Sequence, residues 1–312
     1  MAEGLVQESK KHKPMEDLGV EYFRDLYKRS LFQQSSRNKS LFVMHDLIND
    51  LAQWAAGQLC YWLEDKSGGK ISTKVRHFSY AHCEYDGITK FKGLTKDMRL
   101  RTFLPLPTKN WSYLTNYVSS CLLPQFRCLR VLSLSGYHIF ELPSSIGDLK
   151  HLRYLNLSYA KITSLPESTS SLYNLQTLIL KDCSSLTKLP KKIENLVNLR
   201  HLDITNANSI IEMSMGMAKL KSLRTLTNFV VRKDKIVDLM NLESLGTLCI
   251  SHLENMLDER KVNLKGKRNL DTLVLKWDDD LQDAGVATDI LDMLRPHGTI
   301  KTLSIKGYVG AK

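Results

Sequence analysis

Few side chains in this sequence have the types and spacing that catalysis requires, and each candidate lacks a necessary companion. Gly69-Lys70 has the Gly-Lys pair of a phosphate-binding loop, but the position where such a loop needs another glycine is Glu64. The acidic residues 278–280 follow a strand-like segment, as a magnesium-binding acid does, yet without a phosphate cradle they are better explained as a solvated turn. A third candidate group matches no standard zinc spacing and consists of His77, His82 and Cys83. The sequence therefore predicts no enzyme and no metal site.

The motif Met44-His45-Asp46 is a more specific candidate because of its position. It directly follows a short apolar strand candidate, residues 41–43, and the apolar residues after it recur at helical spacing. A histidine at the mouth of a helix can reach a phosphate together with the N-terminal N–H groups of that helix. On spacing alone, however, an ordinary polar first turn is the favoured explanation.

The elements that must position any binding residue are set by a repeated motif, Leu-x-x-Leu-x-Leu. The motif begins at Leu129, Leu152, Leu175 and Leu199, so its copies start 23, 23 and 24 residues apart (129 to 152 to 175 to 199). A fixed period in this range is the signature of a leucine-rich-repeat solenoid, an α/β fold with a curved parallel sheet. The leucines fill the interior, and the residues between them face the other side of the sheet.

A second register supports the solenoid. Leu-Pro steps recur at Pro143, Pro166 and Pro190, and proline, which lacks an N–H, fits a turn that leaves the sheet. The ninth position of each repeat, often asparagine in such proteins, holds none in these four copies. The residues at this position are Tyr137, Ala160, Cys183 and Ala207. Other groups must therefore form the backbone hydrogen bonds that an asparagine would make.

The concave face of the sheet is the second candidate for function. Residues at the third, fifth and seventh positions of each motif should form columns across neighbouring strands, and the second position adds a basic rim of Arg130, Arg153, Arg200 and Arg224 that Gln176 interrupts. A mixed polar and aromatic curved surface suits a protein ligand, although any solenoid must expose some surface there. The residues we expect to contact a partner are Tyr154, Asn156, Ile179, Lys181, His201 and Asp203.

The chain divides into four parts. Residues 1–65, with an amphipathic helix at 15–32 and a second helix ending at Gly57, should form a small, mainly helical domain. Residues 66–74 resemble a flexible linker, and residues 75–128 an irregular region that caps the solenoid. Residues 129–312 are the repeats. The spacing between successive motifs becomes irregular toward the C-terminus, and the sequence ends just after the strand of its last repeat. We therefore expect a solenoid truncated at its C-terminus.

Charge and composition exclude several classes of protein. The net charge of +11 is spread over scattered Lys and Arg residues, which favours a basic solvated surface over a nucleic-acid partner. The N-terminus lacks the basic and apolar regions of a signal peptide, and no apolar stretch is long enough to form an integral membrane segment. The six cysteines have no spacing typical of a disulfide framework. We therefore expect a soluble, cytoplasmic chain.

With these residues in view, the chain resembles part of a plant intracellular immune receptor of the coiled-coil, nucleotide-binding, leucine-rich-repeat class. The resemblance covers nearly the whole chain. It is carried by Met1-Ala2-Glu3-Gly4-Leu5, Glu16-Asp17-Leu18-Gly19, the block from Met44-His45-Asp46 to Ala52, Leu100-Arg101-Thr102-Phe103-Leu104 and Leu273-Val274-Leu275-Lys276-Trp277.

The resemblance implies that residues 1–65 are a winged-helix-like end of the nucleotide-binding module. It also implies that His45 is the histidine that such receptors place against the β-phosphate of bound ADP. The P-loop, the magnesium-binding strand and the coiled coil of that family are absent. We therefore expect no cofactor for this chain, whereas full-length relatives use ADP and ATP. The implied partners are a pathogen effector or a guarded host protein, and the remainder of a nucleotide-binding module.

The predicted function is effector recognition and autoinhibition in plant defence, without enzymatic activity. Two alternatives share the repeats. An extracellular receptor ectodomain usually carries a Gly-x-Ile-Pro element, cysteine-paired caps and a signal sequence, whereas this chain has Leu-Pro steps. A ubiquitin-ligase substrate adaptor needs a ligase-docking helical domain at its N-terminus, and the block that begins at Met44 resembles the immune receptors far better.

Overall fold

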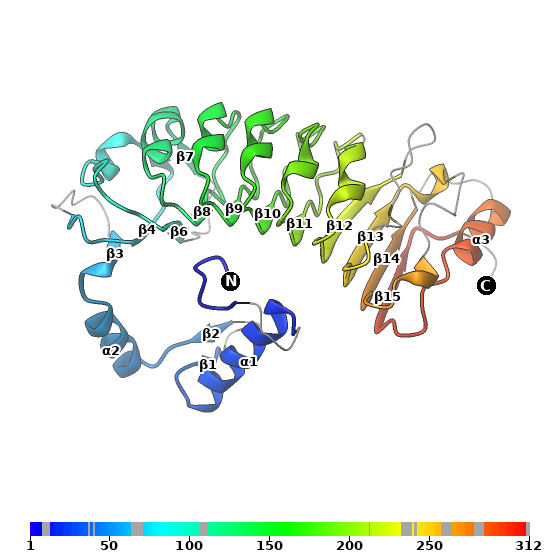
Figure 1. Cartoon of the computed structure of the whole chain (residues 1–312), viewed down its shortest axis with the longest axis horizontal. Coiled ribbons are helices and arrows are strands. Elements are labelled where there is room, and N and C mark those ends of the chain that lie inside the picture. Colours follow the sequence, from blue (N-terminus) through cyan, green and yellow to red (C-terminus); the bar gives the residue numbers. More distant parts are fainter. Residues whose placement is uncertain are drawn as a thin grey trace.

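The repeats build one curved parallel sheet with short helices on its outer side (Figure 1). The computed structural model describes residues 1–7, 13–36, 38–39, 41–63, 71–106, 112–211, 213–231, 239, 242–256, 264–277 and 284–309. Within these residues, the sheet has 11 strands, and each strand pairs with the one before it in the solenoid. The predicted leucine-rich-repeat solenoid is confirmed.

All neighbouring strands of this sheet are parallel, and their register follows the repeat. Leu132, Leu155, Leu178 and Leu202, each the fourth residue of its motif, lie opposite one another. The strands are β3 (Cys60–Leu63), β4 (His77–Ala81), β6 (Thr102–Leu106), β8 (Val131–Ser133), β9 (Tyr154–Asn156), β10 (Thr177–Ile179), β11 (His201–Asp203), β12 (Thr225–Val230), β13 (Thr247–Ser251), β14 (Thr272–Lys276) and β15 (Thr302–Lys306).

The motif leucines form a continuous core between the sheet and the outer helices, and those of the regular repeats are fully buried. Pro143 and Pro166 directly precede two of the outer helices, as expected for turns that leave the sheet. The helices of the solenoid are η2 (Ile88–Phe91), η3 (Val118–Leu122), η4 (Leu123–Gln125), η5 (Ser144–Asp148), η6 (Glu167–Ser171), η7 (Ile193–Asn195), η8 (Met215–Lys219), η9 (Leu253–Asn255), η11 (Leu264–Gly266) and α3 (Ala284–Met293). A separate pair of parallel strands comprises β5 (Tyr85–Asp86) and β7 (Tyr113–Leu114).

The missing asparagine ladder is replaced mainly by backbone groups. The residue before each ninth position has a positive φ, and these residues are Gly136, Tyr159, Asp182 and Asn206. In this left-handed conformation the N–H of Tyr159 donates to the carbonyl of Lys181 at 2.9 Å, and the N–H of Asp182 donates to that of Thr205 at 2.8 Å. The thiol of Cys183, which is fully buried, contacts the carbonyl oxygen of Leu157 at 3.1 Å. These turns are thus tied to their neighbours without an asparagine at the ninth position.

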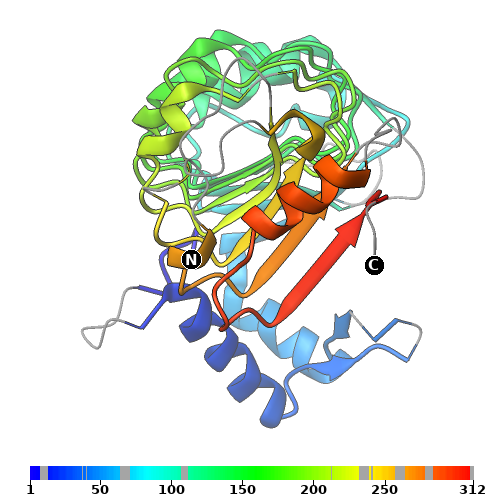
Figure 2. The ribbon, with the colours of Figure 1, turned by 90° about the vertical axis from the view of Figure 1, so that its right-hand side faces the viewer.

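The N-terminal part lies on the concave side of the solenoid (Figures 1 and 2). It consists of α1 (Met15–Lys28), the antiparallel hairpin of β1 (Gln33–Gln34) and β2 (Phe42–Val43), and α2 (Asp46–Ala56), which is followed by η1 (Gly57–Leu59). Aromatic rings of α1 and the hairpin pack together, with the centroids of Phe23 and Phe42 4.8 Å apart. No residue of α2 is buried, and Trp54 is 80% exposed.

The boundary between the two parts differs in detail from the expectation. β3 already belongs to the solenoid sheet, so the sheet starts before the expected domain end at residue 65. Most of the expected linker at residues 66–74 lies outside the described residues, as do Gly69-Lys70 and the acidic residues 278–280. In the part of the chain that is described, no helix is both long and apolar enough to cross a bilayer.

Candidate functional site

Five of the six predicted concave residues lie on three consecutive strands, β9, β10 and β11. The register places Tyr154 in one column with Thr177 and His201, and Asn156 in another with Ile179 and Asp203. Lys181 follows β10 and is exposed, whereas the other five predicted residues are half-buried. The sequence columns are therefore adjacent in space, and their partner-binding role stays a prediction.

Two of these side chains are engaged in holding their own turns. The Asn156 carboxamide oxygen accepts hydrogen bonds from the N–H of Ser158 at 2.9 Å and from its hydroxyl at 2.7 Å. The Asp203 carboxylate accepts from the Thr205 N–H at 3.0 Å and from the Thr227 hydroxyl at 2.8 Å. Substituting either residue would therefore disturb the turns as well as the surface.

His201 contacts a residue from the opposite end of the chain, Glu16 in the first turn of α1. The Glu16 carboxylate accepts hydrogen bonds from Arg200 Nε at 2.8 Å and Arg200 Nη2 at 2.7 Å, and it lies 3.1 Å from His201 Nε2 and 3.5 Å from Arg224 Nε. We call these four residues the Glu16 clamp. The two hydrogen bonds from Arg200 form the planar, bidentate pair that orients a carboxylate most strongly.

The clamp excludes much of the surrounding water, since the Arg200 side chain is 10% exposed and that of Glu16 is 24% exposed. Burial alone would raise the pKa of the Glu16 carboxyl, but the hydrogen bonds from His201 and Arg200 outweigh it and hold the pKa well below its usual range. Glu16 is therefore a carboxylate at neutral pH, and the clamp is a charged contact between α1 and the concave face.

The clamp should give the docking of α1 a defined pH dependence. Because the pKa of Glu16 is lower in the folded state than the ordinary 4.5, its stabilising contribution is present above pH 4.5 and is lost as the pH falls further. Hydrogen exchange of α1 measured from about pH 6 down to about pH 3 should reveal this loss once the intrinsic exchange rate is subtracted. The variant Glu16→Gln should lack this component. An identical pH profile in the two proteins would contradict it.

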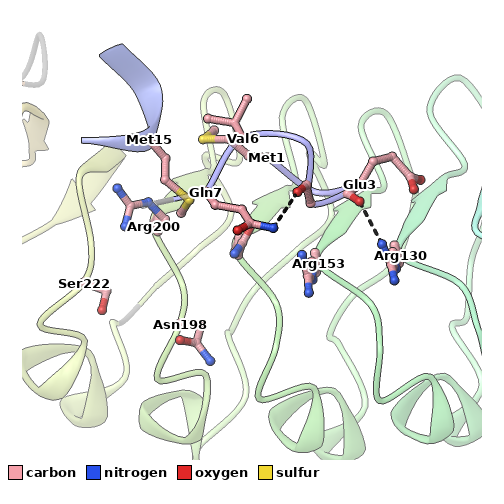
Figure 3. A pocket seen from close by; sticks show the side chains of 12 residues that line it. Met1, Glu3, Val6, Gln7, Met15, Arg130, Arg153, Asn198, Arg200 and Ser222 are labelled. Carbon is pink, nitrogen blue, oxygen red and sulfur yellow. Dashed lines mark hydrogen bonds between the residues drawn. The ribbon is translucent and has the colours of Figure 1, made fainter. Parts of the chain in front are cut away.

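A second contact surface lies beside the clamp, where residues 1–7, which we call the N-terminal strap, cross the concave face (Figure 3). Arg130 Nη1 donates to the carbonyl oxygen of Glu3 at 2.7 Å, and the Thr102 hydroxyl donates to the Glu3 carboxylate at 2.6 Å. Gly4 has a φ of 85° and faces Arg153, which lies within 3.4 Å of the position a Cβ would take. A hollow of about 530 Å³ lies between the strap, Met15 and the rim arginines and is open to solvent on one side.

His45 does not share this site. It is the N-cap of α2, its ring Nδ1 accepts from the Leu47 N–H at 3.3 Å, and its side chain is exposed. Met44 is half-buried and Asp46 is exposed in the first turn of the helix. An ADP phosphate requires several converging donors, and α2 buries none of its residues against the rest of the described chain. The described residues around His45 therefore do not fit an ADP site.

The two histidines first considered for metal binding each form a hydrogen bond with a hydroxyl group. His77 Nδ1 lies 3.0 Å from the Thr102 hydroxyl, and His82 Nδ1 bonds to the Ser112 hydroxyl. Burial lowers the pKa of His82. No group of three potential metal ligands converges among the residues that the structure describes.

Glu16 is the functional candidate that the sequence did not single out. The sequence did indicate the residues that Glu16 contacts, because arginines recur at the second motif position and a row of like charges needs counter-charges. The acidic pair Glu16-Asp17 at the start of a helix is a suitable counter-charge. No spacing rule, however, joins residues 184 positions apart, as Glu16 and Arg200 are.

Comparisons with known proteins agree with both parts of this structure. Residues 112–308 match the family described as leucine-rich repeat region, and residues 1–52 match the disease resistance protein winged helix domain. A disease resistance protein of Arabidopsis thaliana is 41% identical over 99% of this chain and 23% of its own length. An RPP13-like disease resistance protein of the same plant is 39% identical over 100% of this chain and 31% of its own.

A third relative, the disease resistance protein RGA2 of Solanum bulbocastanum, is 42% identical over 99% of this chain and 30% of its own length. The chain thus spans between 23% and 31% of the length of these relatives. Its repeats place the chain in the leucine-rich repeat family, and residues 1–52 before them are similar to the winged helix domain of disease resistance proteins.

Proposed function

We propose that this chain is the recognition and autoinhibitory part of a cytoplasmic plant immune receptor, and that it acts by binding proteins and not by catalysis. The observation that carries the proposal is the Glu16 clamp. It joins the winged-helix segment to the concave face through a desolvated, bidentate ion pair. The surface suited to a protein partner is therefore occupied in part by the chain's own N-terminal residues.

The clamp supports a competition mechanism. Tyr154 and Ile179 lie in columns that adjoin the clamp, and Lys181, which follows the strand of Ile179, is exposed. A pathogen effector or a guarded host protein that binds these columns would favour the state in which α1 has left the face. A ligand shifts such an equilibrium only by its difference in affinity for the two states. Because α1 leads through the hairpin to α2, its release would also free the segment that carries His45.

In this proposal, nucleotide binds to the remainder of the receptor. The residues around His45 do not fit an ADP site, so we propose that ADP and ATP are held by a nucleotide-binding module that α2 contacts. The exposed Leu47 and Trp54, at 73% and 80%, provide an apolar surface for that module. In this proposal the chain acts as a sensor, and the nucleotide-binding module responds to whether α1 is docked on the concave face.

A chimeric receptor tests the autoinhibitory role. The matching segment of RGA2 is replaced by this chain, and the chimera is expressed in leaves without a pathogen. The wild-type chimera should cause no cell death. Glu16→Arg places a third positive side chain against Arg200 and Arg224 and should therefore cause a cell-death response. Protein accumulation is measured by immunoblot in the same leaves.

Asp17→Arg is the matched control, because Asp17 is exposed in the same helical turn and undergoes the same change of charge. It should leave the chimera quiet. A Glu16→Arg chimera that accumulates normally but causes no cell death, or an equal cell-death response to both variants, would show that the clamp does not inhibit the receptor.

A further inference from the structure

A second hollow of the solenoid is lined almost entirely by positive side chains. This cavity, of about 300 Å³, lies next to the strap cavity and is bounded by Arg76, Arg99, Arg101, Cys128, Arg130 and His151. We call it the arginine pocket. It contains neither the Glu16 clamp nor the concave columns, so its chemistry needs a separate explanation.

The repeat itself builds the pocket. Arg76, Arg101 and Arg130 directly precede β4, β6 and β8, and the Arg101 N–H donates to the Arg76 carbonyl at 2.7 Å, as the Arg130 N–H does to the Arg101 carbonyl at 2.8 Å. Their Cα atoms are therefore about one strand spacing apart, roughly 4.8 Å. Arg99, Cys128 and His151 form a second column, two residues before Arg101, Arg130 and Arg153 respectively.

Two of the pocket arginines, Arg76 and Arg130, are oriented by neutral groups. Arg76 Nη1 donates to the carbonyl oxygens of Thr73 and Val75, both at 3.0 Å, and Arg130 donates to the carbonyl of Glu3. The Glu3 carboxylate instead accepts from Thr102 and points away from Arg130 (Figure 3). Within the described residues, no carboxylate lies within 4.0 Å of the guanidinium nitrogens of Arg76, Arg99, Arg101 or Arg130. Among the described residues, these stacked guanidinium groups therefore have no carboxylate in direct ion-pair contact.

This pattern differs from the clamp on the same rim, where Arg200 and Arg224 share one carboxylate. Guanidinium groups match phosphate oxygens in pairs, and several of them around a small cavity suit an anion of high charge density. A single carboxylate from a peptide would leave most of the pocket unneutralised. The volume of about 300 Å³ is also at the lower end of the range for small-molecule sites.

We propose that the arginine pocket binds a small molecule or headgroup that carries two or more phosphate groups. Arg76 and Arg130 are half-buried and held in place, while Arg99, Arg101 and His151 are exposed at its mouth. The held arginines define the site, and the exposed ones close around the bound anion. The site is independent of the proposed receptor function, because it uses none of the clamp residues.

Isothermal titration with tripolyphosphate tests the pocket on the purified chain. Wild type should bind at one saturable site, and the affinity should fall with added salt. Arg99→Ser with Arg101→Ser removes two exposed guanidinium groups and should weaken binding by about a hundredfold, since each lost charge-assisted contact is worth about tenfold or more. Arg101→Lys, which keeps the charge and loses the bidentate geometry, should weaken binding by about tenfold.

Lys191→Ser with Lys192→Ser is the matched control, because both lysines are exposed on the solenoid outside the pocket and the loss of charge is the same. This control should bind as wild type does, and tripolyphosphate should raise the Tm of wild type and control alike but not that of the Arg99/Arg101 variant. Absence of saturable binding to wild type, or an equal loss of affinity in both double variants, would overturn the proposal.

Vesicles of phosphatidylcholine, with and without a phosphoinositide, separate the two sources of such a ligand. Capture that requires the phosphoinositide and is lost in the Arg99/Arg101 variant would identify a lipid headgroup. Tripolyphosphate binding without vesicle capture would identify a free phosphorylated metabolite. Vesicle capture that both double variants retain would overturn the assignment of the pocket as a headgroup site.

Discussion

Replacing Asp86 by alanine is expected to lower the free energy of unfolding of the capping region by about 3–5 kcal/mol, the usual cost of removing one partner of a buried ion pair. The Asp86 side chain is fully buried and lies 2.6 Å from Lys90 Nζ, whose side chain is 10% exposed. The same carboxylate accepts a hydrogen bond from the hydroxyl of Tyr137, which lies 3.0 Å from the hydroxyl of Tyr80. Burial raises the pKa of both tyrosines, so both remain protonated.

The loss arises because alanine removes the counter-charge of the Lys90 ammonium, which keeps only neutral partners such as the Ala81 carbonyl, and one acceptor of the Tyr137 hydroxyl. Urea unfolding followed by circular dichroism measures the loss, and hydrogen exchange of β4 and β6 locates it, since a solenoid need not unfold in one step. Asp86→Ala combined with Lys90→Met should recover much of the stability, because no unpaired charge is then buried.

Asp271→Ala is the control for this experiment. Asp271 pairs with Lys301 at 2.9 Å, but the two side chains are 51% and 72% exposed, so its loss should cost less than about 1 kcal/mol. Equal destabilisation by Asp86→Ala and Asp271→Ala would mean that burial of the Asp86 network does not matter.

The solenoid could be predicted because its information is local. A leucine at a fixed spacing is buried in every copy, so one motif repeated four times defines the strand, its register and the inner face. The substitute for the asparagine ladder was harder to predict. It depends on a left-handed residue before each ninth position, and Tyr159 is not a type that favours this conformation.

Contacts between distant residues account for what sequence reasoning missed. The Asp86–Tyr137 hydrogen bond joins residues 51 positions apart, and the bidentate pair of the clamp joins residues 184 apart. Each side chain is visible in the sequence as an isolated charge or hydroxyl. Stacking of neighbouring turns of the solenoid brings Asp86 to Tyr137. The return of the N-terminal residues across the concave face brings Glu16 to Arg200 (Figure 1).

The start of the solenoid sheet depends on a similar contact. Residues 60–63 closely follow the second helix and lie within the expected N-terminal domain, residues 1–65. In the structure they form β3 and pair with β4, because Tyr61 stacks on the buried ring of Phe78, with centroids 6.0 Å apart. The first strand of the sheet is therefore recognised by its packing partner and not by its own motif.

Reversing the charge of Glu16 is expected to detach α1 from the concave face while leaving the solenoid folded. Glu16→Arg removes the two hydrogen bonds to Arg200, each worth about 1.5–3 kcal/mol as charge-assisted contacts, and adds repulsion from Arg224. Amide hydrogen exchange should accelerate across α1 by at least about tenfold. The strands β13 and β14, which lie beyond the clamp, should keep their protection.

A second change distinguishes the ion pair from a general effect of the substitution. Arg200→Glu in the Glu16→Arg background restores an opposite pair in reversed order and should recover part of the protection of α1. The recovery is only partial, because His201 and Arg224 still face the new arginine. Asp17→Arg, an exposed neighbour in the same turn, should leave exchange unchanged. Detachment by Asp17→Arg as well would mean that net charge, and not the geometry of the clamp, holds the winged-helix segment on the repeats.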